Sequence, residues 1–131
     1  MRLTAALLQD IVDAARAALP NEAVGLLVGV EGPERYVAMR NASASPYRYS
    51  IDDDEKLRTW VDVESRGEEV LAIVHSHVAS PAEPSQTDIE LAYFPEALYL
   101  ICSLATPDQP DIRAWSIVDG TVTEAELLVA P

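Results

Sequence analysis

Cysteine and basic residues are scarce in this chain, and long apolar runs are absent, and each of these features excludes a class of protein. The one cysteine, Cys102, cannot form an internal disulfide, which fits a reducing compartment. Nine Lys and Arg residues stand against 22 Asp and Glu residues, so we expect no surface that neutralises nucleic-acid phosphates. No apolar run approaches the roughly 18 to 20 residues of a membrane span, and residues 1–4 do not resemble the start of a secretory signal. We therefore expect a cytoplasmic protein that binds neither nucleic acid nor membrane.

Apolar residues make up 49 % of the 131 residues, which is enough to fill one core in a chain of common domain size. We predict a single domain over residues 1–131. The net charge of −13 has two interpretations, a solvated surface that keeps the protein soluble or a surface that attracts a basic partner, and the first is simpler. The acidic block Asp52–Glu55 has a local explanation, because carboxylates stabilise the N-terminal end of a helix.

The spacing of apolar residues predicts alternating helices and strands. Helices are expected over residues 3–19, 53–65 and 85–94, and strands over 24–29, 35–39, 70–75, 97–104, 112–118 and 121–129. Asp119-Gly120, between the last two strands, indicates a hairpin with a type I′ turn. This order predicts an α/β (α+β) domain in which helices flank a central mixed β-sheet.

Both histidines of the chain lie at the end of the predicted buried strand 70–75. His75 and His77 are two residues apart, so on a strand they share a face, with about 6.5 Å between them along the backbone. They can converge on one metal ion, and because a catalytic zinc usually takes three protein ligands, Asp88 is the candidate for the third. From these residues alone two alternatives stay open. The histidines can simply pack or face solvent, and Ser85-Gln86-Thr87-Asp88 also fits a helix capping box.

A longer pattern favours the metal site. His75-Ser76-His77, seven intervening residues, Ser85, two residues and Asp88 resemble the metal-binding signature of the JAMM (MPN+) metalloprotease family. Upstream, Glu22 precedes the apolar, glycine-containing segment 24–29, as the family's catalytic glutamate does. The resemblance extends over essentially the whole domain, and it implies the family's fold, a cytidine-deaminase-like mixed sheet flanked by helices.

The resemblance also implies a role for each of these residues. His75, His77 and Asp88 would bind one Zn²⁺ per chain, and Glu22 would act as general acid and base. Ser85 would help hold the catalytic water and the developing oxyanion. Two other polar residues are not expected in the chemistry, since Ser76 points to the opposite strand face and Cys102 lies in an apolar run as a small buried hydrophobe.

Within the family, the chain looks most like compact bacterial peptidases that release cysteine from a carrier protein during cysteine biosynthesis. The loop 41–46 ahead of Tyr47 and the terminal segment 117–124 carry this likeness. It implies a zinc-dependent metallopeptidase or isopeptidase that hydrolyses an amide bond at the C-terminal glycine of a ubiquitin-like sulfur-carrier protein, its partner, and it suggests a homodimer.

Two alternatives for the function remain, a general deconjugase of ubiquitin-like modifiers and a noncatalytic MPN scaffold that binds a protein partner. The chain also departs from the compact bacterial peptidases at two places. It has Val24 where they often carry cysteine, and its histidine loop, residues 78–83, has its own sequence. These departures leave the leaving group open.

Overall fold

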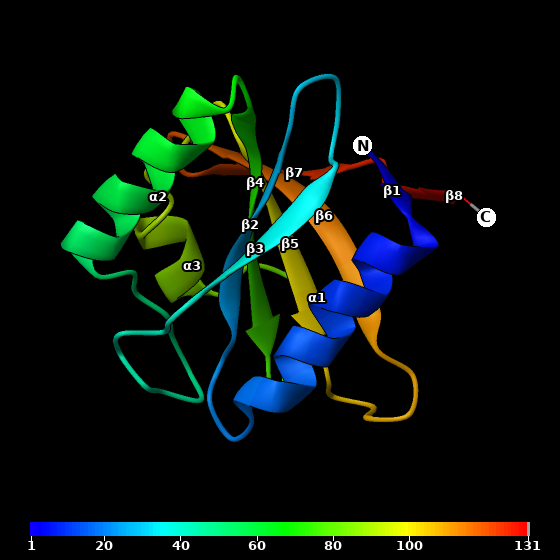
Figure 1. Ribbon diagram of the computed structural model, residues 1–131. Helices are drawn as coiled ribbons and strands as arrows, with labels where there is room; N and C mark the ends of the chain where they lie inside the picture. The colour runs from blue at the N-terminus through cyan, green and yellow to red at the C-terminus, as the bar shows by residue number, and fades with distance from the viewer. Residues whose placement is uncertain (131) are drawn as a thin grey trace.

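A six-stranded mixed sheet forms the centre of the molecule. The computed structural model describes residues 1–130, and its strands follow the order β3-β2-β4-β5-β6-β7 (Figure 1). β4 and β5 run parallel, whereas the other neighbouring strands run antiparallel, which confirms the predicted mixed sheet. The strands are β2 Val24–Gly29, β3 Arg35–Met39, β4 Glu69–His77, β5 Leu98–Ser103, β6 Asp111–Val118 and β7 Thr121–Ala125.

Helices cover both faces of this sheet. α1 (Ala5–Ala18) lies on one face, and α2 (Asp53–Ser65) and α3 (Gln86–Glu90) lie on the other (Figure 1). Successive side chains of a strand point to opposite faces, so β4 contributes Val74 to the core under α1 and Ile73 to the core under α2. None of the helices within residues 1–130 combines the length and apolar character that a bilayer crossing requires.

The helix ends follow local chemistry. The side chain of Thr4 accepts a hydrogen bond from the N–H of Leu7 and so starts α1, and Asp52 does the same for the N–H of Glu55 at the start of α2. Three acidic residues fill the first turn of α2, which agrees with the local explanation of the acidic block. Gly67, at φ +71°, follows the last turn of α2 in the left-handed conformation that ends many helices.

Two predicted boundaries were wrong at the ends of the chain. The helix expected from Leu3 begins at Ala5, because Thr4 caps it and Arg2–Thr4 forms a short strand, β1. The strand expected over 121–129 is broken after Ala125, and Leu128–Ala130 forms a separate strand, β8, that pairs in parallel with β1. The Asp119-Gly120 turn itself is confirmed, since both residues have the positive φ that a type I′ turn requires.

The helix predicted over 85–94 was also wrong in extent, because α3 ends at Glu90. Pro95 disfavours helical backbone at Phe94, and the ring of Phe94 stacks on Trp60 of α2 with ring centroids 5.3 Å apart. Its N–H donates to the hydroxyl of Tyr99 at 3.1 Å. The last residues of the predicted helix thus lie outside it, with Phe94 packed against α2.

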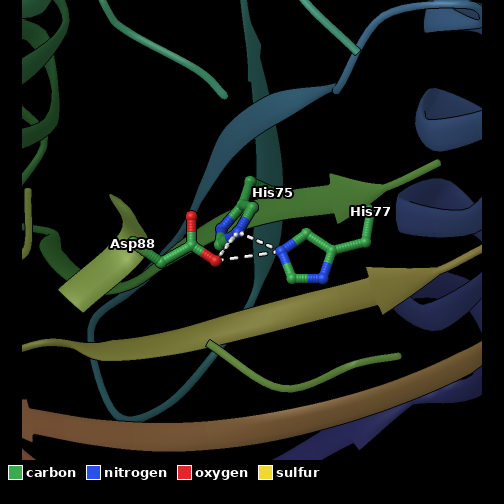
Figure 2. Close-up of side chains that lie close together, drawn as sticks. All are labelled: His75, His77 and Asp88. Carbon is green, nitrogen blue, oxygen red and sulfur yellow. Dashed lines mark hydrogen bonds and ion pairs between the residues drawn. The ribbon is translucent and has the colours of Figure 1, made fainter. Parts of the chain in front are cut away.

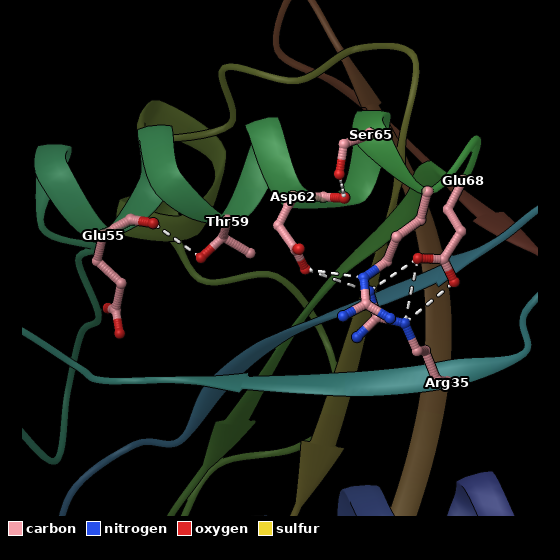
Figure 3. Close-up of polar contacts among 7 residues, drawn as sticks. Arg35, Glu55, Thr59, Asp62, Ser65 and Glu68 are labelled. Carbon is pink, nitrogen blue, oxygen red and sulfur yellow. Dashed lines mark hydrogen bonds and ion pairs between the residues drawn. The ribbon is translucent and has the colours of Figure 1, made fainter.

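An ion-pair cluster ties the edge strand β3 to the α2 side of the molecule. The guanidinium of Arg35 binds both carboxylate oxygens of Glu68, with separations of 2.8 to 3.2 Å, and lies 3.9 Å from Asp62 (Figure 3). Planar two-point contacts of this kind are stronger than single surface ion pairs. The cluster fastens β3 to the turn between α2 and β4.

Gly25 leaves room for an aromatic ring on the same face as α1. The ring of Tyr36 in β3 lies across Gly25, so that any side chain at position 25 would occupy the same space as the phenol. Tyr36 in turn packs against the core under α1.

We expect Gly25→Ala to destabilise the fold by about 1 to 3 kcal/mol, the usual cost of overpacking. Denaturant unfolding would measure the loss, and the same substitution in a Tyr36→Ala background should cost clearly less. Equal losses in the two backgrounds would contradict this explanation.

Candidate metal centre

Three buried polar side chains from β4 and α3 meet at one point. The Nε2 atoms of His75 and His77 are 3.3 Å apart, and they lie 3.1 and 2.9 Å from Oδ2 of Asp88 (Figure 2). All three residues are at most 3 % exposed. The structure therefore brings together the three predicted ligands, although they come from segments separated by a ten-residue stretch.

Local structure explains how each ligand reaches this point. His75 and His77 occupy the last positions of β4 that face α2 and α3, as the strand alternation predicts. Asp88 is held by the capping box of α3, in which the Ser85 hydroxyl accepts from the N–H of Asp88 and the carboxylate accepts from the N–H of Ser85. The capping box is thus confirmed, and the same residue also faces the histidines.

The ring of His77 is oriented by the loop that follows it. Nδ1 lies 2.7 Å from the carbonyl oxygen of Pro81, and since a carbonyl only accepts, Nδ1 carries a proton, which leaves Nε2 as the nitrogen that faces the cluster and can bind a metal ion. The neighbouring carbonyls of this loop are bound as well, Ser80 by the hydroxyl of Ser103 and Ala82 by the indole N–H of Trp115. Side chains of three strands thus fix three consecutive carbonyls.

The ring of His75 is held by packing. Tyr49 lies against it with ring centroids 4.6 Å apart and an interplanar angle of 31°. Within residues 1–130, Nδ1 of His75 is buried and has no hydrogen-bond partner. A buried polar atom without a partner is costly, and such atoms are uncommon outside functional sites.

The three ligand atoms fit a tetrahedral zinc ion. Zinc bonds of about 2.0 to 2.1 Å place neighbouring ligand atoms about 3.3 Å apart, and the observed separations are 2.9 to 3.3 Å. Two imidazole nitrogens and one carboxylate oxygen form the borderline donor set that suits zinc and leaves a fourth position for water. His75, His77 and Asp88 are therefore the residues that can hold a metal ion.

Two of the three ligands already have the protonation state that metal binding requires. Burial alone would raise the pKa of the Asp88 carboxyl, but hydrogen bonds from both histidines and from the N–H of Ser85 outweigh it and hold the pKa well below its usual range. Burial also lowers the pKa of His75 by more than the neighbouring Asp88 raises it. Asp88 is thus charged and His75 neutral at neutral pH, as ligands must be. For His77, burial alone would lower the pKa, but the hydrogen bonds to Asp88 and to the carbonyl of Pro81 outweigh it and raise the pKa, so a metal ion would displace a proton from this ring.

The two predicted catalytic residues differ in exposure, because Glu22 is buried and Ser85 is exposed. Glu22, just before β2, is 3 % exposed, and among the described residues its Oε1 is buried without a hydrogen-bond partner. Burial raises its pKa to about 7, with His77 lowering it and Asp88 raising it through their charges. Ser85 is exposed and reaches the centre only through its bonds to Asp88.

Sequence reasoning missed several residues that shape the centre. Tyr49 packs on His75, while Ser103 and Trp115 bind the loop that orients His77. Asn41 binds the backbone carbonyl of Glu22 at 3.0 Å. No spacing or motif identifies these residues, because each acts through a backbone carbonyl or a ring face.

Fold and site together define the class of the protein, an α/β domain with a buried His-His-Asp cluster that can hold a metal ion at the end of its central strands. The chain belongs to the Prok-JAB family, the prokaryotic homologs of the JAB domain, whose model matches residues 4–118. This confirms the resemblance to JAMM and MPN proteins.

Two curated relatives illustrate the family. The chain is 42 % identical over 125 residues to the CysO-cysteine peptidase of Mycobacterium tuberculosis, which covers 93 % of this chain and 86 % of the relative. It is 35 % identical over 88 residues to the desampylase of Haloferax volcanii, covering 64 % of this chain and 63 % of the relative.

Solved structures give the same fold. A protein from Desulfitobacterium hafniense superimposes with a TM-score of 0.89 at 37 % identity, covering 98 % of this chain and 92 % of the other. A JAB1/MPN domain protein from Archaeoglobus fulgidus superimposes with a TM-score of 0.69 at 22 % identity over the full length of both chains. The predicted MPN/JAMM-like fold is confirmed.

The raised pKa of Glu22 predicts a stability cost in the metal-free protein. Between pH 4.5 and about 7 the unfolded chain loses this proton while the folded chain keeps it, so stability falls as the pH rises through that window. Glu22→Gln removes the buried charge, and we expect it to stabilise the fold at pH 8 by up to about 3 kcal/mol.

Urea unfolding with a chelator present would test this at pH 8 and pH 5, with Glu64→Gln on the exposed surface of α2 as control. The stabilisation by Glu22→Gln should be largest at pH 8 and shrink toward pH 5. A gain that is the same at both pH values, or a loss at pH 8, would contradict the role of burial.

Proposed function

We propose that this protein is a zinc-dependent metallopeptidase that hydrolyses the amide bond at the C-terminal glycine of a small ubiquitin-like sulfur-carrier protein, with cysteine as the leaving group. The observation that carries the proposal is the meeting of His75, His77 and Asp88 near the buried Glu22, whose pKa responds to the charges of His77 and Asp88. Three protein ligands with one open position are the arrangement of catalytic rather than structural zinc sites.

The division of labour follows from the chemistry of these groups. Bound at the three ligand atoms, zinc would polarise the scissile carbonyl and lower the pKa of water to about 7. Glu22, with a pKa of about 7, can take the proton of the attacking water and later give it to the leaving nitrogen. Its carboxylate is buried, so bulk water competes little for that proton.

Ser85 fits a supporting role at the mouth of the centre. Its hydroxyl oxygen accepts from the N–H of Asp88, which leaves the hydroxyl proton free to donate. We propose that this hydroxyl donates a hydrogen bond to the carbonyl oxygen of the substrate as negative charge develops there. The exposure of Ser85 agrees with a group that meets the substrate rather than the metal.

The relatives support the substrate class. A CysO-cysteine peptidase is the relative with 42 % identity over 93 % of the chain, and we extend its type of bond to this protein. Desampylases share 35 % and 29 % identity over shorter stretches, which favours a general deconjugase of ubiquitin-like modifiers as the second candidate. A noncatalytic scaffold is disfavoured, because scaffolds have no reason to retain three converging ligands and a buried glutamate.

A cleavage assay distinguishes the two enzymatic candidates. Zinc-loaded protein is incubated with a sulfur-carrier protein whose C-terminal glycine is amide-linked to cysteine, and separately with the same carrier isopeptide-linked to a lysine. Mass spectrometry of the carrier should show loss of cysteine within minutes, with chelator abolishing the reaction and added zinc restoring it. Cleavage of the lysine conjugate alone would favour the general deconjugase, and cleavage of neither would reject both.

Glu22→Gln separates proton transfer from metal binding. The amide cannot accept the proton, whereas the three ligands are unchanged, so we expect turnover to fall by about 10²- to 10⁴-fold with zinc content retained. Asp88→Asn is the matched variant, since it removes a charged ligand and should lose zinc as well as activity. Near-normal turnover of Glu22→Gln, measured with metal analysis on the same sample, would remove Glu22 from the mechanism.

A further inference from the structure

The backbone around Glu22 is held by hydrogen bonds on every side. The N–H of Glu22 donates to the carbonyl of Ser45 at 2.9 Å, and its own carbonyl accepts from Nδ2 of Asn41 at 3.0 Å. The N–H of Ala23 donates to Oγ of Ser76 at 2.7 Å, while the N–H of Ser76 donates back to the carbonyl of Ala23 at 3.1 Å. We call these four hydrogen bonds to the backbone of Glu22 and Ala23 the clamp. They hold the segment in place although it precedes the regular part of β2.

The side chain of Asn41 makes one of the clamp hydrogen bonds and three others within its own loop. Its Nδ2 donates to the carbonyls of Glu22 and Arg48, and its Oδ1 accepts from the N–H groups of Ser43 and Ser50 at 3.0 and 3.2 Å. Two donors and two lone pairs are thus all engaged, which is the full capacity of an amide side chain. One side chain joins the Glu22 segment to the loop 41–50.

That loop also touches the metal centre. It carries Tyr49, whose ring lies 4.6 Å from the ring of His75, and it supplies the Ser45 carbonyl that binds the N–H of Glu22. Asn41 thereby links the segment that carries the glutamate to the loop that packs on a ligand histidine. Ser76, between the two histidines on the other face of β4, links the same segment to the ligand strand.

We propose that Asn41 and Ser76 are positioning residues that hold the Glu22 carboxylate in register with the metal ligands. The inference rests on the proposed function for its kinetic readout, but the clamp itself can be measured without any substrate. Its physical reason is that proton transfer in catalysis demands placement to a fraction of an ångström, and a shift of about 1 Å can cost about 100-fold in rate.

Asn41→Asp is the sharpest variant, because it is isosteric and replaces the donating NH₂ group by a carboxylate oxygen. The acceptors for Ser43 and Ser50 remain, whereas a carboxylate would now face the carbonyls of Glu22 and Arg48. We expect kcat to fall about 30- to 100-fold with KM changed less than about threefold, since the substrate surface is untouched. Zinc affinity should stay within about threefold of the unsubstituted protein.

Ser43→Ala is the matched control. It removes a hydrogen bond between the hydroxyls of Ser43 and Ser50 in the same loop, but no side-chain contact with the Glu22 segment. Its kcat should stay within about threefold of the unsubstituted protein. A fall as large as that of Asn41→Asp would show that general loosening of the loop, rather than the clamp, is responsible, and would overturn the proposal.

Hydrogen exchange provides the readout that does not depend on activity. In Asn41→Asp the N–H groups of Glu22 and Ala23 should exchange at least about tenfold faster, while those of β5 should be unchanged. If the unsubstituted protein cleaves no carrier conjugate, the proposed function fails, and this exchange result still decides whether Asn41 holds the segment. Unchanged exchange at both positions, or an unchanged kcat in an active enzyme, would overturn the proposal.

Ser76→Ala tests the clamp from the other side and serves where Asn41→Asp does not fold. It removes the acceptor of the Ala23 N–H and keeps the strand backbone, so exchange at Ala23 should accelerate and kcat should fall with zinc retained. Restoration of exchange and kcat in Ser76→Thr, which keeps a hydroxyl oxygen, would support the hydrogen bond as the cause. Unchanged exchange in Ser76→Ala would contradict it.

Discussion

The Asp88 carboxylate has to stay charged while it is buried between two imidazole rings, and the surrounding structure provides the contacts that keep it charged. Oδ2 of Asp88 lies 3.1 Å from His75, 2.9 Å from His77 and 2.9 Å from the N–H of Ser85. An unpaired buried charge would be too costly to keep, so each partner is needed. They come from a sheet strand and a helix N-terminus, and the loop between them is fixed by His77 itself and by two further side chains, Ser103 and Trp115.

One face of β4 packs into the apolar core, and the other carries the candidate metal ligands. The face toward α1 is apolar up to Val74 and completes a core in which Leu27, Leu100 and Ala114 are fully buried. The other face ends in two histidines near a carboxyl with a raised pKa. Buried polar atoms without partners lower stability, and the dry core on the opposite face offsets that cost while holding the strand rigid.

Periodicity alone could predict much of this fold, since β2, β3 and α2 have the bounds that apolar spacing indicates. The convergence of His75 and His77 followed from the two-residue repeat of a strand. The path of the loop 78–84, which decides whether Asp88 reaches them, could not be predicted, because backbone carbonyls hold it and any residue supplies a carbonyl. The pairing of β1 with β8 was missed for a related reason, as strands of three residues are too short for a pattern.

The chain departs from the compact bacterial peptidases at Val24 and in the loop 78–83. The distinction between side-chain and backbone contacts explains why these two departures have different structural consequences. Val24 pairs with His75 and is 1 % exposed, so a change there alters packing under the site and does not meet a substrate. The loop 78–83 contacts His77 through the carbonyl of Pro81, and the carbonyls of Ser80 and Ala82 hold it in place, so its exposed side chains can vary while the ligand geometry persists. Ala79 and Glu83 are exposed on that loop. Of the two departures, the loop therefore offers exposed side chains that another molecule can contact, whereas Val24 does not.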